Sequence, residues 1–141
     1  MNTLQDAIIL GFKEYDTMSI PGPQANPRIL QYFSKIGHSW VRDDETAWCA
    51  AFMGWCLESV GIPSTRMLTA RSYLNWGKKT TTPKFGDIVV FWRISPTSGY
   101  GHVTFFLKES NGYTYVLGGN QSNEVCVSRY LTSTVLGYRT L

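Results

Sequence analysis

The spacing of apolar residues divides this chain into two parts with different periodicities. In the first part, apolar positions recur at helical spacing, as in the segment that carries Ile29, Leu30, Phe33 and Ile36. This spacing predicts helices over residues 3–15, 28–36, 46–60 and 69–76. The helix over residues 46–60 is apolar nearly all round, which is typical of a central helix that its neighbours cover on most sides.

After Pro83 the pattern changes, because β-branched and aromatic residues become frequent. The pattern predicts strands over residues 87–92, 103–108, 113–117, 125–130 and 135–139. Turn signals such as Asn111-Gly112 and Gly118-Gly119 separate them. Helices followed by consecutive strands indicate an α+β fold with an antiparallel sheet. A length of 141 residues is typical of one domain, so we expect a single domain over residues 1–141.

Charge and composition exclude several classes of partner. The net charge is +3, and the basic residues are scattered, with Lys78-Lys79 as the only adjacent pair, so no nucleic-acid partner is expected. No stretch approaches membrane-spanning length, so no membrane insertion is expected. Residues 1–16 predict an amphipathic helix, because Asp6 interrupts the apolar run and no basic leader precedes it. This favours synthesis in the cytoplasm without a signal peptide.

The three cysteines have neither the number nor the spacing of a disulfide framework, and no C-x-x-C pair is present. We therefore expect no metal site and no cofactor. Cys56 fits a buried structural thiol and Cys126 a structural one on a strand, whereas Cys49 occupies the start of the predicted central helix. If Thr46 is the N-cap, Cys49 lies in the first turn, where the helix dipole and unpaired N–H groups favour the thiolate. A small buried hydrophobe remains the alternative for Cys49.

The acidic residues before Cys49 act in the opposite direction. Asp43, Asp44 and Glu45 would raise the pKa of a nearby thiol by like-charge repulsion. They could instead cap the helix or bind a cationic part of a ligand.

His102 is the candidate base. Gly99 and Gly101 bracket it, and small neighbours allow close approach of the backbone. A base on a strand that packs against the start of the nucleophile helix has the geometry that activates a thiol. His38, in a loop before that helix, is the competing base, and a purely structural histidine is the alternative for His102.

Asn120 is the candidate that orients the imidazole. It follows His102 by one predicted hairpin, and the end of the second strand of an antiparallel hairpin returns beside the start of the first. Gln121 is the second choice for this role. A plain turn over Gly118-Gly119-Asn120-Gln121 is the alternative explanation of the same residues.

Four segments together resemble the CHAP-type peptidoglycan hydrolases, which are relatives of the NlpC/P60 peptidases. These segments are residues 44–52 around Trp48-Cys49, residues 86–91, Gly101-His102-Val103 and residues 117–122. The chain is similar, more narrowly, to a small single-domain group found in phages and bacterial genomes. Residues 21–29 and the ending Leu136-Gly137-Tyr138-Arg139 also fit that group.

The resemblance implies a papain-like fold, with N-terminal helices packed on an antiparallel sheet of about five to six strands. It implies Cys49 as nucleophile, His102 as general base and then general acid, and Asn120 as the orienting residue. The implied substrate and partner is peptidoglycan, cut at an amide of the stem peptide or cross-bridge. Trp48, Trp92 and Tyr100 are candidate groove walls, with ordinary packing as the alternative. Arg71 is either a surface residue or a contact to a substrate carboxylate.

The substrate of such an enzyme lies in the cell wall or periplasm. Two routes would bring the protein there: release of a phage endolysin through a holin, or injection as an antibacterial effector, for instance by type VI secretion. The second route implies an immunity protein as a partner. Two other function classes stay open: a non-catalytic wall-binding or phage structural module, and a Cys-His acyltransferase or deamidase.

Overall fold

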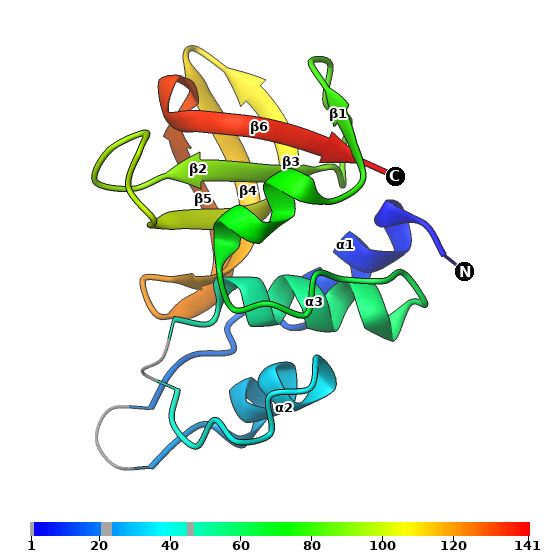
Figure 1. The fold of residues 1–141 in the computed structure, drawn as a ribbon, viewed down its shortest axis with the longest axis vertical. Coiled ribbons are helices and arrows are strands. Elements are labelled where there is room, and N and C mark those ends of the chain that lie inside the picture. Colours follow the sequence, from blue (N-terminus) through cyan, green and yellow to red (C-terminus); the bar gives the residue numbers. More distant parts are fainter. Residues whose placement is uncertain (1, 21–23, 45–46) are drawn as a thin grey trace.

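The computed structural model describes residues 2–20, 24–44 and 47–141, in which helices lie against one face of an antiparallel sheet (Figure 1). The helical segments are α1 (Leu4–Lys13), α2 (Pro27–Lys35), α3 (Cys49–Ser59) and two short 3₁₀ segments, η1 (Ala70–Asn75) and η2 (Thr132–Thr134). The strands are β1 (Lys78–Thr80), β2 (Ile88–Trp92), β3 (Gly101–Ser110), β4 (Tyr113–Gln121), β5 (Glu124–Leu131) and β6 (Val135–Thr140). Their order across the sheet is β1-β6-β2-β3-β4-β5. The predicted α+β fold is confirmed.

Helix α3 is the centre of the helical layer. Every residue from Cys49 to Leu57 is buried, and α3 contacts α1, α2, β3 and β4. Figure 1 shows α3 between α2 and the sheet. The apolar residues on all sides of this helix therefore have a partner surface on each side, as the sequence predicted.

The other face of the sheet encloses a second, smaller apolar cluster. It contains Val89, Phe91, Phe106 and Val116, with Tyr130, Val135 and Tyr138 packed against them. The rings of Phe91 on β2 and Tyr130 on β5 have centroids 5.0 Å apart. Strands β2 and β5 are three steps apart in the sheet, which in a flat sheet would separate them by about 14 Å. The sheet must therefore curl around this cluster.

Several predicted boundaries differ from the structure. Helix α3 begins at Cys49, and Thr46, the predicted N-cap, lies outside the described residues. The segment predicted as a fourth helix is the 3₁₀ segment η1. The polar strand β1 was not predicted, because its three residues carry no alternating pattern and are mostly exposed.

The predicted turn over residues 118–121 is wrong, because β4 continues through it to Gln121. The turn follows at Ser122 and Asn123, whose φ angles of 51° and 66° suit a two-residue hairpin connection. Pairing with β5 shifts between Gly118↔Cys126 and Gln121↔Glu124, so β4 carries one extra residue there. This is a β-bulge, and Asn120 has a φ of 57° within it.

The bulge lies directly against α3. A Cβ atom added to Gly119 would lie 2.7 Å from Phe52 Cβ and 2.9 Å from the Trp48 ring. Only a glycine allows β4 and the start of α3 to approach so closely.

We predict that Gly119→Ala lowers the free energy of unfolding by about 1–3 kcal/mol, because the added methyl group overpacks the contact with Phe52 and Trp48. Gly99→Ala is the matched control, since nothing lies within 4 Å of its added Cβ. Urea unfolding of the two variants measures the difference. Equal stability of both variants would mean that α3 and the bulge are not in close contact.

Candidate active site

Cys49 is the first residue of α3, with Trp48 as N-cap. Its side chain is 7% exposed, at the surface of the core. With Thr46 as N-cap, the sequence predicted Cys49 as the third residue of the helix. In the structure it is the first. Backbone N–H groups in the first turn of a helix have no partner within the helix, so the Cys49 N–H remains available to a bound group.

The Cys49 thiol is neutral in the resting protein. Burial raises its pKa above the ordinary value, against smaller lowering effects from the Val103 N–H, the Arg93 charge and the N–H groups of Ala50 and Cys49 itself. The N–H groups of the helix start favour the thiolate, as the sequence suggested, but by less than burial disfavours it. The positive helix end is present, but loss of water outweighs it.

Asp44 does not act on the thiol as the sequence suggested. Its carboxylate is buried and accepts hydrogen bonds from the backbone N–H groups of Ile20 and Asn26, both at 2.8 Å. It therefore holds the backbone at Ile20 and at Asn26 against the chain that leads into α3. Glu45 lies outside the described residues.

The Val103 N–H reaches the thiol through a gap between β3 and β4. The Phe106 N–H donates to Asp87 O at 2.7 Å on the β2 side. Because successive N–H groups of a strand alternate in direction, the Val103 N–H points toward β4. Pairing of β3 with β4 begins only at Phe105↔Leu117, so β4 does not use this donor. Cys49 thus reaches β3 one residue from His102.

His102 lies in β3, is 2% exposed and has its ring against Gln121. His102 Nε2 and Gln121 Oε1 are 2.9 Å apart. On its other side, the Gln121 amide nitrogen donates to Cys126 O at 2.6 Å. A carbonyl oxygen can only accept, so the Cys126 contact fixes which end of the amide is nitrogen and which is oxygen.

This amide orientation determines the protonation of the histidine. Since Gln121 Oε1 can only accept, His102 Nε2 carries the proton and Nδ1 keeps a free lone pair. The Tyr130 hydroxyl donates to the same Oε1 at 3.2 Å, and its ring meets the His102 ring edge-on, with centroids 5.5 Å apart. Tyr130 is a site residue that the sequence gave no reason to select, because only the curl of the sheet brings β5 to His102.

His102 is a neutral base. Burial lowers its pKa to about 4; the bond to Gln121 raises the pKa and the Arg93 charge lowers it, both by less than burial does. The site therefore holds a neutral imidazole with a free Nδ1, and the Cys49 thiol contacts the N–H of the next residue, Val103. The pair is suited to moving a proton from sulfur to nitrogen when a carbonyl group is attacked.

Asn120 does not hold the imidazole; Gln121 does. Continuing the register from Phe105↔Leu117 would put Asn120 opposite His102, which is the geometry that the sequence suggested. The bulge inserts one residue and gives that place to Gln121. The second choice of the sequence analysis is thus the residue that the fold brings to the ring.

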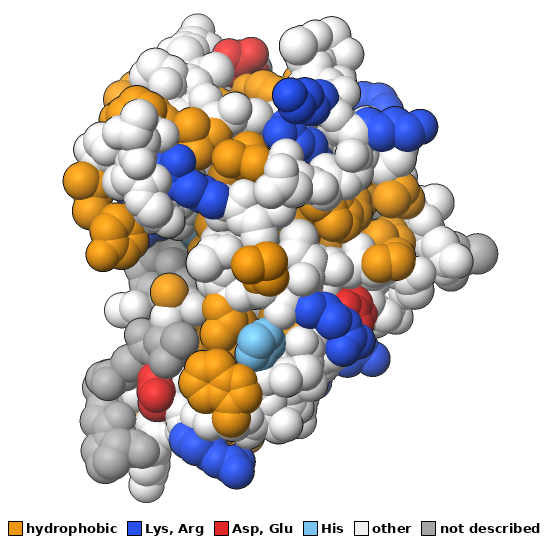
Figure 2. Space-filling model, viewed as in Figure 1, with side chains coloured by type: hydrophobic (Ala, Val, Ile, Leu, Met, Phe, Trp, Pro, Cys, Tyr) orange, Lys and Arg blue, Asp and Glu red, His pale blue; other side chains and the backbone are white. Residues whose placement is uncertain are grey.

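His38 is occupied elsewhere. One ring nitrogen, Nε2, lies 2.7 Å from Arg66 O, and the other, Nδ1, accepts from the Trp40 indole at 3.0 Å. Figure 2 shows a histidine among apolar side chains on the lower part of its face, and the exposed Trp40 ring contacts the His38 ring. With both nitrogens engaged, His38 is not placed to serve Cys49 as a base.

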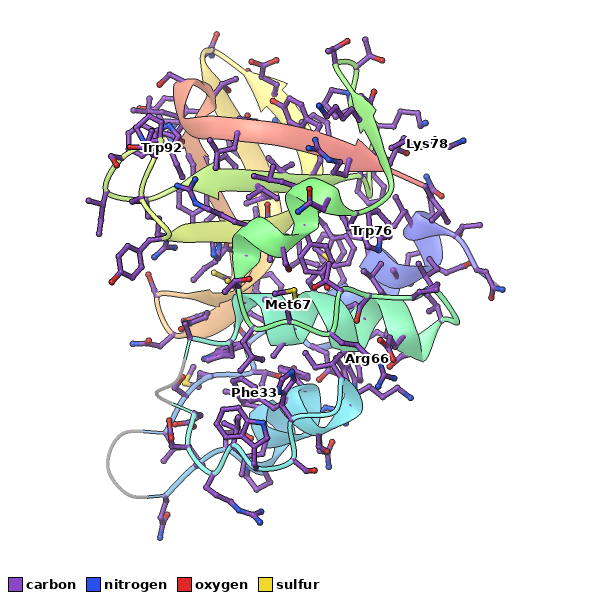
Figure 3. All side chains as sticks on the ribbon, viewed as in Figure 1. Phe33, Arg66, Met67, Trp76, Lys78 and Trp92 are labelled. Atoms are coloured by element: carbon purple, nitrogen blue, oxygen red, sulfur yellow. The ribbon has the colours of Figure 1, made fainter. Side chains whose placement is uncertain are left out.

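The three aromatic candidates for a groove wall differ in exposure. Trp48 is fully buried and donates to Ser19 Oγ, so it is a core residue and not a wall. Trp92 is half-buried at the end of β2, on the side of the sheet away from α3 (Figure 3). Tyr100 is 64% exposed in the β2–β3 loop. Trp92 and Tyr100 remain candidates.

Arg71 has a structural task. Its guanidinium donates to the carbonyl oxygens of Ser95, Pro96 and Tyr100, at 2.9–3.2 Å. It therefore holds the β2–β3 loop against η1. These bonds engage the guanidinium N–H groups that a contact to a substrate carboxylate would need.

Among residues 2–20, 24–44 and 47–141, no group of three or more His, Cys, Asp or Glu side chains could hold a metal ion. No helix in this part of the chain is long and apolar enough to cross a membrane. The cysteines are all free thiols, and Cys56 is fully buried in the core.

Comparisons with known proteins address the family and the fold. A family model described as "CHAP domain" matches residues 41–120, which is more than half of the chain and contains Cys49 and His102. A search of curated protein sequences found no match.

Solved structures share the fold at low sequence identity. The P60 domain of antigen MAP1204 from M. avium subspecies paratuberculosis has a TM-score of 0.57 at 15% identity, over 97% of this chain and 92% of that one. An NLP/P60-family protein similar to a lipoprotein, SAV0400 from Staphylococcus aureus Mu50, has a TM-score of 0.58 at 16% identity, over 97% of this chain and 40% of that one. Ly7917 has a TM-score of 0.51 at 13% identity, over 96% and 61%.

Proposed function

Because this chain belongs to the CHAP domain family, we propose that it is a peptidoglycan hydrolase that cuts an amide bond with Cys49 as nucleophile. The observation that carries the proposal is the fixed tautomer of His102, which leaves Nδ1 free as a base, next in sequence to Val103, whose N–H contacts the Cys49 thiol. In this proposal Gln121 takes the orienting role that the sequence assigned to Asn120.

The first half of the reaction forms a thioester. The Cys49 sulfur attacks the amide carbonyl carbon while its proton passes to His102 Nδ1, and the Cys49 N–H stabilises the negative oxygen that results. The C–N bond then breaks, and the leaving nitrogen takes the proton from His102. The acyl group of the stem peptide or cross-bridge stays on the sulfur.

The second half restores the enzyme. His102 Nδ1 takes a proton from water, and the hydroxide oxygen attacks the thioester carbon. The C–S bond breaks, sulfur recovers the proton, and a carboxylic acid leaves. Throughout both halves the Gln121 oxygen holds Nε2–H and stabilises the positive imidazolium that forms transiently.

The proposed site of action is the cell wall, reached as a phage endolysin or as an injected antibacterial effector. The proposed chemistry is the same for both routes.

We predict that Cys49→Ala abolishes the release of peptides from purified sacculi, lowering the rate by at least about 10³-fold, because the thioester cannot form. Mass spectrometry of the digest identifies the bond that is cut. The protein should stay folded, since alanine fits the space of the thiol. Cys56→Ala removes a thiol from the same helix and is the control, which keeps its activity.

Release of the same peptides by Cys49→Ala would contradict the assignment of Cys49. Unchanged sacculi with the unmutated protein, together with sedimentation of the protein with the sacculi, would favour a wall-binding module instead.

We predict that Gln121→Ala lowers kcat by about 10- to 100-fold, because His102 loses the acceptor that fixes its tautomer. Asn120→Ala, which changes the adjacent residue of the same bulge, should keep kcat within about threefold of the unmutated value. The initial rate of amine release from sacculi measures both. The opposite ranking of the two variants would return the orienting role to Asn120.

A further inference from the structure

A pocket beside His102, on the side of the sheet away from α3, has a composition that the proposed mechanism does not explain. Its volume is about 360 Å³. It is lined by the end of β2, by His102 and by the end of β5, and its residues are Phe91, Trp92, Arg93, His102, Tyr113, Arg129, Tyr130, Leu131 and Thr134. Two of these side chains are cations and none is an acid. The pocket therefore favours an anion.

Arg93 is free to bind a ligand. Within the described part of the chain, its guanidinium makes no hydrogen bond or ion pair. All its hydrogen bonds are made by the backbone, since its N–H donates to Tyr100 O and its carbonyl oxygen accepts from the Ser95 N–H and the Ser98 hydroxyl. Arg93 and His102 line the same pocket, so an anion bound by Arg93 would lie close to the imidazole. The Arg93 charge also lowers the pKa of both Cys49 and His102.

Arg129 is held in place from the other side of the pocket. The carbon at the centre of its guanidinium lies 4.1 Å from the centroid of the Tyr113 ring. Stacking on an aromatic face restricts a guanidinium while leaving its N–H edge available for hydrogen bonds. Arg93 follows β2 and Arg129 belongs to β5, so the two cations reach the pocket lining from different strands.

The apolar lining decides which kind of anion fits. Trp92 and Leu131 offer side-chain surface for an organic group, and the Tyr130 hydroxyl is committed to Gln121. A carboxylate on a short peptide combines a planar anion, which the guanidinium fork matches, with carbon atoms that such walls can cover.

We propose that this pocket is a subsite for a carboxylate of the substrate, bound by Arg93 and Arg129, so that the preferred substrate carries a free carboxyl group within a few bonds of the amide that is cut. The inference rests on the proposed function for the identity of that substrate as a wall peptide. The binding itself does not depend on catalysis.

Binding to the Cys49→Ala protein tests the subsite without turnover. The probes are the peptide L-Ala-γ-D-Glu-L-Lys-D-Ala and the same peptide with its carboxyl groups converted to amides. Titration followed by the NMR signal of the Trp92 indole N–H should show that the carboxylate peptide binds about tenfold or more tightly than the amide peptide. Adding Arg93→Gln or Arg129→Gln should remove most of that preference.

Lys108→Gln is the matched control. Lys108 is also an exposed cation of this sheet stacked on a tyrosine ring, 4.9 Å from the centroid of Tyr115, but it does not line the pocket. It should keep the full preference for the carboxylate peptide.

Two results would overturn the subsite: equal affinity for both peptides, or a preference that survives both Arg93→Gln and Arg129→Gln. Neither result bears on whether the unmutated protein digests sacculi. Conversely, a protein that fails to digest sacculi but shows the arginine-dependent preference would retain the carboxylate site and lose only the hydrolase proposal.

Discussion

One amide group sets the chemistry of this site. Gln121 stands between the Cys126 carbonyl, which can only accept, and the His102 ring, which can do either. The carbonyl oxygen determines which end of the Gln121 amide is nitrogen, and the amide oxygen then determines that the ring proton lies on Nε2. A backbone group of β5 thus decides that His102 presents a bare Nδ1. The β-bulge at Gly119-Asn120 is what brings Gln121 into that position and leaves the Val103 N–H unpaired for Cys49.

The resting state that follows is uncharged. Burial raises the pKa of the Cys49 thiol and lowers that of His102 to about 4, so neither group is ionised near neutral pH. A preformed thiolate–imidazolium pair would need more solvation than this buried site supplies. Proton transfer therefore accompanies attack on the carbonyl, when the Cys49 N–H and the nearby Arg93 charge can stabilise the developing negative charge.

The sequence was sufficient for most of the elements and for the placement of Cys49 and His102 at the starts of α3 and β3. Apolar periodicity identifies the helices and β-branched runs identify the long strands, because burial of one face leaves a visible pattern. Cys49 and His102 stand at helix and strand starts, where the signals are local. The strand β1 has no such pattern, since its three residues lie at the polar edge of the sheet.

Gly118 and Gly119 show why the third residue was misplaced. Paired glycines are typical of turns, yet here each one serves a close approach inside a strand. A Cβ atom on Gly118 would lie 2.8 Å from Gln121 Oε1, and one on Gly119 would lie 2.7 Å from Phe52 Cβ. The sequence alone does not distinguish a glycine needed for a turn from one needed for contact. The resulting one-residue shift in β4 places Gln121, instead of Asn120, against the His102 ring. Tyr130 and the two arginines come close to His102 only because the sheet curls, and that curl depends on packing between strands far apart in the sequence.

The most direct test is ¹⁵N NMR of the imidazole nitrogens, with a His38→Gln variant to assign the two histidines. The account predicts that at pH 6 the His102 ring is neutral with its proton on Nε2, and that it becomes protonated only as the pH falls toward 4. In Gln121→Ala the proton should distribute over both nitrogens. A ring that carries its proton on Nδ1, or that is already an imidazolium at pH 6, would contradict the account.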